Sequence, residues 1–277
     1  MKADLHTHSN FSDGVNDPSE NVRIAKEIGL KALGITDHDS VLGVVEAIET
    51  GEKIGMEIVP GIELSTLHSG QEIHILGYFI NYKDKIFLDK LNELQKKRKI
   101  RNEMMIAKLN ELGIDISMSD VVAKIRRSET NIGRPHIGEV LIDKGVVKTM
   151  NQAFKIYLGR HGKAYVNAIR ITPEQGIDII KDAGGVPVIA HPGIYGNDKL
   201  VVSLVEYGLE GIEVYHPDHN KNDKCKYQKL ANTYKVLATG GSDFHGVRKG
   251  ETFHSPIGSN SVSYDVVQKL KELSLNS

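Results

Sequence analysis

The sequence has 277 residues, a formal net charge of −1, 40% hydrophobic and 26% charged residues, which is ordinary for a globular protein of one large domain or one domain with an insertion. The balanced charge excludes binding of polyanions over the whole surface, so any nucleic-acid contact must come from a local patch. The single cysteine, Cys225, excludes an internal disulfide framework and fits a reducing compartment. No apolar run is as long as a membrane span, and the N-terminus lacks a signal-peptide pattern. We therefore expect a cytoplasmic protein with no membrane segment and no evident obligate protein partner.

Predicted strands and helices alternate at both ends of the chain. Short apolar runs read as strands, and stretches that begin with Pro after a capping residue and stop at Gly read as helices. Strands are predicted at residues 2–7, 32–36, 57–63, 72–79, 186–190, 211–215 and 236–239, and helices at about 16–29, 41–54, 172–183 and 264–273. The alternation predicts an α/β fold with parallel strands and helical crossovers.

A mostly helical segment, residues 83–165, interrupts this alternation. We interpret it as an insertion that caps the main domain, which then comprises residues 1–82 and 166–277. Its first helix carries the basic stretch Gln95-Lys-Lys-Arg-Lys-Ile-Arg101, in which Arg98 and Arg101 fall on the apolar stripe of the helix. Two interpretations stay open: a solvated helix face, or arginines that point toward a phosphate.

Histidines and acids gather at the ends of the predicted strands. His6 and His8 lie two residues apart on one strand, so their imidazoles face the same side. The complete set is His6, His8, Asp13, His38, Glu63, His74, His191, Asp243 and His245. The carboxyl ends of parallel strands meet at one rim of a barrel, where burying several charges is costly unless cations bind them. We predict three divalent metal ions that share Glu63, with manganese preferred and zinc or iron as alternatives.

Several motifs resemble those of the PHP (polymerase and histidinol phosphatase) superfamily in order and spacing. They are His6-Thr-His8, Thr36-Asp-His38-Asp, Gly61-Ile-Glu63, Ala190-His191-Pro and Gly241-Ser-Asp243-Phe-His245. The helical segment with Gly133-Arg134-Pro135-His136 is similar to one branch, which includes 3',5'-nucleoside bisphosphate phosphatases and the 5'-to-3' exoribonuclease RNase AM. The resemblance implies a distorted (β/α)7 barrel with a trinuclear metal site.

The resemblance also implies which residues hold each ion. The first ion would bind to His6, His8, Glu63 and Asp243. The second ion would bind to Glu63, His74 and His191, and the third to Asp13, His38 and His245. The residues expected at the reacting phosphate are His6, His8, Glu63, His191, Asp243 and His245.

Clustered divalent ions favour phosphoester hydrolysis, because they lower the pKa of bound water and neutralise phosphoryl oxygens. Arg134, His136 and Arg160 would bind the remaining phosphate or the ribose-phosphate backbone of a phosphorylated nucleotide or short RNA. The alternatives are a histidinol-phosphate phosphatase or another metallohydrolase such as an amidohydrolase on the same scaffold, and a module that binds metal or nucleotide without turnover.

Five further histidines lie outside the predicted ligand set. His216 and His219 follow the sixth strand, and we expect a structural role or a position beside the substrate, with the structural role favoured. His68, His161 and His254 have no supporting motif and are expected to be surface or local-contact residues.

Overall fold

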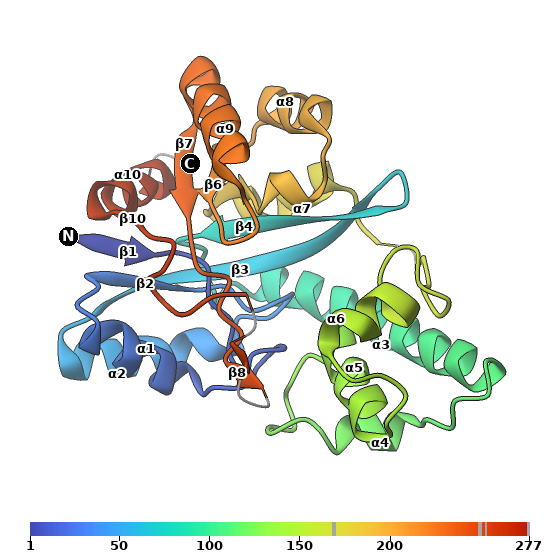
Figure 1. Ribbon diagram of the computed structural model, residues 1–277. Helices are drawn as coiled ribbons and strands as arrows, with labels where there is room; N and C mark the ends of the chain where they lie inside the picture. Colours follow the sequence, from blue (N-terminus) through green and yellow to red (C-terminus); the bar gives the residue numbers. More distant parts are fainter. Residues whose placement is uncertain (168–169, 249–250, 253, 276–277) are drawn as a thin grey trace.

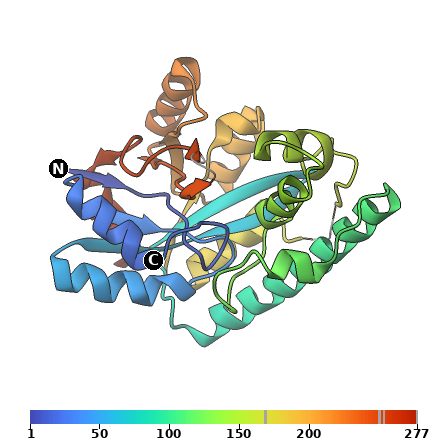
Figure 2. The same cartoon turned by 60° about the horizontal axis from the view of Figure 1, so that its bottom comes forward.

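The structure is a computed structural model, which describes residues 1–167, 170–248, 251–252 and 254–275. Its eight-stranded main sheet is rolled into a barrel, with helices packed around it and a helical segment at the lower right in Figure 1. Figure 2 shows the same arrangement from another side. The predicted α/β barrel is therefore confirmed. Within the described part of the chain, no helix combines the length and apolar character that crossing a bilayer requires.

All seven predicted strands are present in the sheet, together with one that was not predicted. The strands are β1 (Lys2–Asp4), β2 (Ala32–Ile35), β3 (Glu57–His68), β4 (Gln71–Tyr78), β5 (Val186–Ile189), β6 (Gly211–Tyr215), β7 (Leu237–Gly240) and the unpredicted β10 (Val262–Ser263). Their order is β10-β1-β2-β3-β4-β5-β6-β7. Interior Leu, Ile, Val and Ala side chains from these strands are fully buried, as expected for strands covered on both faces.

Strand β4 departs from the predicted parallel arrangement. It pairs antiparallel with both β3 and β5, because a tight turn at Ser69 and Gly70 joins β3 directly to β4 without a crossover helix. Glu63 lies opposite Leu76 in this hairpin, with His74 two residues away on the same face. The hairpin therefore places Glu63 and His74 diagonally next to each other.

The barrel closes where the chain beyond β1 meets the chain beyond β7. We call residues 5–8 and 240–245 the closure seam. Its backbone hydrogen bonds run from Leu5 N to Gly240 O at 3.2 Å, from Asp243 N to His6 O at 2.9 Å, and from His8 N to Phe244 O at 2.9 Å. Two segments that are far apart in the sequence, each carrying two predicted metal ligands, thus lie side by side.

Six helices cover the outside of the barrel. They are α1 (Pro18–Glu27), α2 (Leu42–Ile54), α7 (Pro173–Asp182), α8 (Asp198–Tyr207), α9 (Lys221–Tyr234) and α10 (Tyr264–Leu275). The predicted capping box is present, with Gln175 N donating to Thr172 Oγ1 at 3.3 Å. Helices α8 and α9 were not predicted. In α9 the reason is its composition, since among its residues only Tyr227 and Ala231 are buried.

Short elements follow some of the strands. They are the 3-10 turn η2 (Pro192–Ile194) after β5 and the small hairpin of β8 (Val247–Arg248) and β9 (Glu251–Thr252) after β7. Both come directly after predicted ligand residues, so they shape the rim of the barrel.

The interrupting segment contains α3 (Lys85–Glu111), α4 (Met118–Val122), α5 (Arg134–Asp143), α6 (Met150–Ala153) and the π-helical turn η1 (Phe154–Leu158). Buried residues from Met105 to Val166 form a hydrophobic cluster of its own. The first half of α3 instead packs into the barrel core through Phe87, Leu91 and Leu94. Helix α3 therefore holds the segment rigidly against the barrel.

The closure seam predicts a specific stability defect. A Cβ added at Gly241 would clash with the backbone N and Cα of His6, so we expect Gly241→Ala to lower the free energy of unfolding by about 2 kcal/mol. Urea denaturation followed by circular dichroism measures this change. Lys229→Ala, on the exposed face of α9, should stay within about 0.5 kcal/mol of the wild type. An unchanged midpoint for Gly241→Ala would show that the seam is loosely packed.

Candidate active site

The predicted ligands surround one cavity of about 510 Å³ at the strand ends. Seven of them line it: Asp13, His38, Glu63, His74, His191, Asp243 and His245. The other two, His6 and His8, are fully buried and contact Glu63 and Asp243 from the barrel side. The structure thus brings all nine predicted ligands together.

Four donor atoms form a compact group at the closure seam. His6 Nε2 and His8 Nε2 lie 3.1 Å apart, and Glu63 Oε2 lies 3.4 Å from the first and 3.3 Å from the second. Asp243 Oδ1 lies 3.2 and 3.1 Å from the same two nitrogens. A tetrahedron around a cation with bonds of about 2.0–2.1 Å has edges of ~3.4 Å. The spacing of these atoms is therefore that of a metal-binding site.

A second group shares His8 with the first. It comprises His8, Asp13, His38 and His245, whose donor atoms all lie within 4.8 Å of one another. His245 Nε2 is 3.2 Å from Asp13 Oδ1, and His38 Nε2 is 3.7 Å from Asp13 Oδ2. His245 Nδ1 donates to the carbonyl of Asp243 at 2.8 Å, which leaves its Nε2 lone pair directed at Asp13.

Glu63 connects the groups. Its Oε1 lies 2.8 Å from His74 Nδ1 and 3.0 Å from His191 Nε2. Its other oxygen, Oε2, lies 3.1 Å from His38 Nδ1. One carboxylate therefore contacts imidazoles from every part of the cluster, as a bridging ligand would.

The chemistry of the buried atoms fits bound cations. His8 Nδ1, Asp13 Oδ1 and His38 Nδ1 are buried without a hydrogen-bond partner among the residues that the structure describes. Burying such atoms unsatisfied costs about 1–3 kcal/mol each, whereas a divalent cation would coordinate donors of this kind. Mixed imidazole and carboxylate ligation is typical of transition metals rather than of calcium or magnesium.

Burial and neighbouring charges shift the pKa values of the cluster. Burial alone would raise the pKa of Glu63, but the positive charges of His74 and His6 hold it well below its usual range. Burial lowers the pKa of His38 to about 3 and that of His191 to about 4, which leaves these imidazoles in the neutral form that ligates metals. Burial opposes protonation of His8 as well, yet hydrogen bonds to Asp243 and Glu63 raise its pKa to about 10. A cation would displace that proton.

Sequence reasoning missed Glu213, which orients two of the ligands. It is fully buried in the middle of β6. His6 Nδ1 lies 2.9 Å from Glu213 Oε1, and His191 N donates to Glu213 Oε2 at 2.8 Å. With its Nδ1 hydrogen on Glu213, His6 presents Nε2 as a lone pair to the cluster. The only signal in the sequence was an acid inside an otherwise apolar strand.

The same cavity has a cationic part, which we call the arginine wall. Arg98, Arg101, Arg134 and Arg160 line it. Arg98 and Arg101 are only 6% and 2% exposed, so a solvated helix face is wrong for these two residues. Arg98 donates from Nε and Nη2 to Asp39 Oδ2 at 3.0 and 2.8 Å.

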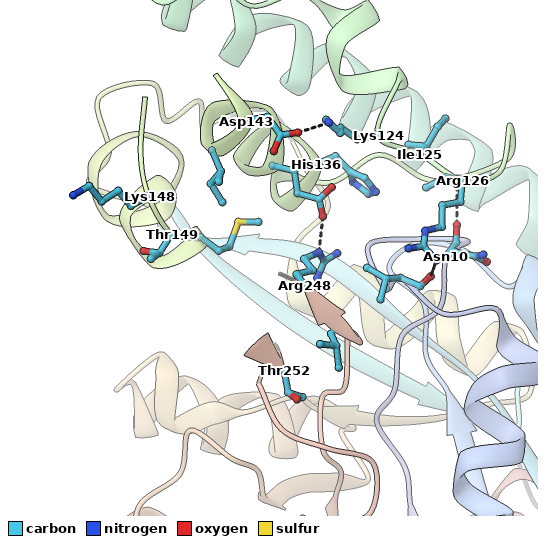
Figure 3. A pocket seen from close by; sticks show the side chains of 17 residues that line it. Asn10, Lys124, Ile125, Arg126, His136, Asp143, Lys148, Thr149, Arg248 and Thr252 are labelled. Carbon is cyan, nitrogen blue, oxygen red and sulfur yellow. Dashed lines mark hydrogen bonds and ion pairs between the residues drawn. The ribbon is translucent and has the colours of Figure 1, made fainter. Parts of the chain in front are cut away.

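The predicted substrate residues are divided between two cavities. Arg134 lines the cavity that holds the predicted metal ligands, which we call the metal-side cavity, and pairs with Glu72 Oε2 at 2.8 Å. Arg160 and His161 line the same cavity. His136 instead lines a neighbouring cavity of about 480 Å³ between α5 and the β8–β9 hairpin (Figure 3). Gly133 N donates to His136 Nδ1 at 3.0 Å, which fixes the turn before Arg134.

Two histidines outside the predicted set contact the ligand Asp243. His216 is fully buried, and its Nε2 lies 3.2 Å from Asp243 Oδ2. Because Asp218 N donates to His216 Nδ1 at 3.1 Å, His216 Nε2 carries the hydrogen and orients the carboxylate. His254, which also lines the cavity, lies 3.3 Å from both Asp218 and Asp243. It is therefore a neighbour of the cluster and not only a surface residue.

His219 has the structural role favoured for it. It is buried, and its Nε2 accepts a hydrogen bond from Gly193 N at 2.9 Å. Its Nδ1 lies 2.9 Å from Val214 O. Both ring nitrogens thus join the backbone after β5 to that of β6.

Known proteins are similar to this chain in sequence and in fold. The PHP domain profile matches residues 4–158. A 5'-3' exoribonuclease from Haemophilus influenzae is 32% identical over 88% of this chain and 90% of its own length. A 3',5'-nucleoside bisphosphate phosphatase from Chromobacterium violaceum is 31% identical over 89% and 88%. A phosphoribosyl 1,2-cyclic phosphate 1,2-diphosphodiesterase from Eggerthella lenta is 29% identical over 89% and 95%.

A solved structure from Bifidobacterium adolescentis, grouped by its description with the metal-dependent phosphoesterases, superimposes with a TM-score of 0.90 at 29% identity. The match covers 98% of this chain and 96% of that one. The profile spans more than half of the chain, and the fold agrees over nearly all of it. The chain belongs to the PHP domain family of metal-dependent phosphoesterases.

Proposed function

We propose that this phosphoesterase hydrolyses a phosphoester of a ribose that carries more than one phosphate. The preferred candidates are 3',5'-nucleoside bisphosphates, followed by the 5' ends of short RNA. One observation carries the proposal: a single cavity is lined both by a cluster of metal-binding donors and by four arginines. The cluster suits the reacting phosphate, and the arginines suit a second anionic group. The relatives named as a bisphosphate phosphatase and an exoribonuclease support the same substrate class.

We further propose that the nine clustered ligands hold three divalent ions. Manganese is the favoured metal, and zinc and iron are the alternatives. Glu63 would be shared, since its two oxygens face different imidazoles. Such ions, when bound, neutralise phosphoryl oxygens and make a nucleophile available at neutral pH. The residues of the chain do the positioning: Glu213 orients His6, and His216 orients Asp243. Both ligands are thereby held in place before substrate arrives.

The arginine wall would hold the part of the substrate that does not react. Arg134 is stacked at 5.6 Å over the ring of Phe154 and keeps one side toward the cavity. Arg160 approaches from the end of η1. His136 would contribute indirectly, by fixing the turn that presents Arg134.

A second candidate substrate is a cyclic phosphate on a phosphorylated ribose. The relative from Eggerthella lenta, which is named for that substrate, aligns with this chain over 95% of its own length. This substrate also carries two phosphate groups, so a cavity lined by both metal-binding donors and arginines suits both candidates. Comparing the rates on an acyclic and a cyclic compound separates them.

The helical segment completes the cavity. We propose that residues 83–165 act as a cap on a barrel made of residues 1–82 and 166–277, because Arg98, Arg101 and Arg134 all come from this segment. A cytoplasmic location remains a prediction from the composition of the sequence.

The first test is hydrolysis of adenosine 3',5'-bisphosphate with Mn²⁺. We expect phosphate release by the wild type and at least a ~1000-fold loss in Asp243→Ala, because a ligand next to both His6 and His8 is removed. Asp265→Ala, an exposed acid on α10, should keep full activity. Release of phosphate by neither protein, or release from histidinol phosphate alone, would refute the proposed substrate class.

The second test concerns Glu213. We expect Glu213→Gln to weaken metal binding by roughly 10–100-fold, because the amide cannot accept from both His6 and the backbone of His191. Titrating activity and heat of binding against Mn²⁺ measures the loss, and excess Mn²⁺ should restore activity. Glu206→Gln on the surface of α8 is the matched control. The same Mn²⁺ affinity in all three proteins would rule out this positioning role.

A further inference from the structure

Within the described part of the chain, Arg101 is a buried cation without an acidic partner. It lies in the second half of α3, is 2% exposed, and lines the metal-side cavity. Its Nε and Nη2 donate only to Asn102 Oδ1, at 3.2 and 2.8 Å. No carboxylate among the residues that the structure describes forms an ion pair with Arg101.

The arginines around Arg101 already use the nearby carboxylates. Asp39 is paired with Arg98 at 2.8 Å. Glu72 is paired with Arg134 at 2.8 Å and with Arg170 at 2.5 Å, and it also lies 3.1 Å from His74 Nε2. Three guanidinium groups thus share these two carboxylates, and Arg101 pairs with neither.

The electrostatics at this position are unfavourable without a ligand. Burial, together with the positive charges of Arg170, Arg98 and Arg134, holds the pKa of Arg101 well below its usual range. The negative charge of Glu72 raises the pKa of Arg101, but this effect is smaller than that of burial and the three arginines. A guanidinium stays protonated in proteins, and an isolated buried charge is costly unless a counter-charge reaches it. The cavity is the direction from which such an anion can come.

We propose that Arg101 binds the phosphate of the substrate that is not hydrolysed, and that it is the main determinant of the preference for doubly phosphorylated substrates. This inference rests on the proposed function and assigns the second phosphate to one residue. Arg134, which the motif near residue 133 singled out, is already neutralised by Glu72 and is coupled through Glu72 to the ligand His74. Arg101 has its full charge available and a planar donor group that suits a phosphate.

The kinetic test compares one substrate with two phosphates and two substrates with one. The metal-loaded enzyme is assayed with adenosine 3',5'-bisphosphate, adenosine 3'-monophosphate and adenosine 5'-monophosphate. We expect Arg101→Met to lower kcat/KM for the bisphosphate by roughly 30–100-fold, mainly through KM, and to change the monophosphate values less than about threefold. Arg101→Lys should recover part of the loss. Lys99→Met, an exposed cation on the same helix, should behave like the wild type.

A stability measurement separates recognition from a structural role. In phosphate-free buffer we expect Arg101→Met to melt at or above the temperature of the wild type, because an uncompensated buried charge has been removed. Adenosine 3',5'-bisphosphate should raise the melting temperature of the wild type more than that of the variant. A variant that melts several degrees lower and loses activity equally on all three nucleotides would overturn the proposal.

The inference and the proposed function can fail separately. If the wild type hydrolyses the bisphosphate and Arg101→Met keeps the same preference for it, the role of Arg101 is wrong while the activity stands. If the wild type shows no turnover, calorimetric binding still tests Arg101. The inference is supported if the wild type binds the bisphosphate more tightly than either monophosphate and Arg101→Met loses this difference. This holds even though the proposed reaction has failed.

Discussion

The site depends on one constraint: mutually close, buried donors around Glu63 must be neutralised by cations. Glu63 contacts imidazoles carried by or following the four strands β1, β2, β4 and β5, and the Nε2 atoms of His6 and His8 lie 3.1 Å apart. Protons can relieve this arrangement only in part, because burial keeps His38 and His191 neutral while Glu63 stays ionised. Metal occupancy and stability of the barrel rim are therefore linked, since ions that bind the folded cluster stabilise it.

The backbone makes this arrangement possible by bringing four ligands together at the closure seam. Hydrogen bonds between residues 5–8 and 240–245 hold His6 and His8 beside Asp243, and Gly241 leaves room for the two chains to meet. Glu213, from β6, then fixes the ring of His6. The donors are thus placed by strands and not by side-chain freedom, which is what a preorganised metal site requires.

Much of this could be predicted from the sequence, because strand ends and period-two spacing are local features. The seven strands and the convergence of nine ligands follow from them. The antiparallel direction of β4 could not be predicted from the alternation of strands and helices. It arises because a turn at residues 69–70, and not a helix, joins β3 to β4. Glu213 could not be distinguished from other polar residues in strands until its partners were known. The arginines of α3 were ambiguous because helical periodicity places a residue on a face but does not say whether core or cavity lies there.

The donor cluster and the arginine wall carry excess charge of opposite sign. Burying either charge is unfavourable without a bound counter-charge. The donor cluster contains ionised carboxylates that need cations, and the arginine wall contains a guanidinium that needs an anion. Helix α3, which carries Arg98 and Arg101, is packed into the barrel core through Phe87 and Leu91. A ligand with one phosphate on the metal side and another on the arginine side satisfies both. We propose that α3, by holding Arg101 in this cavity, makes the site selective for substrates with two phosphates.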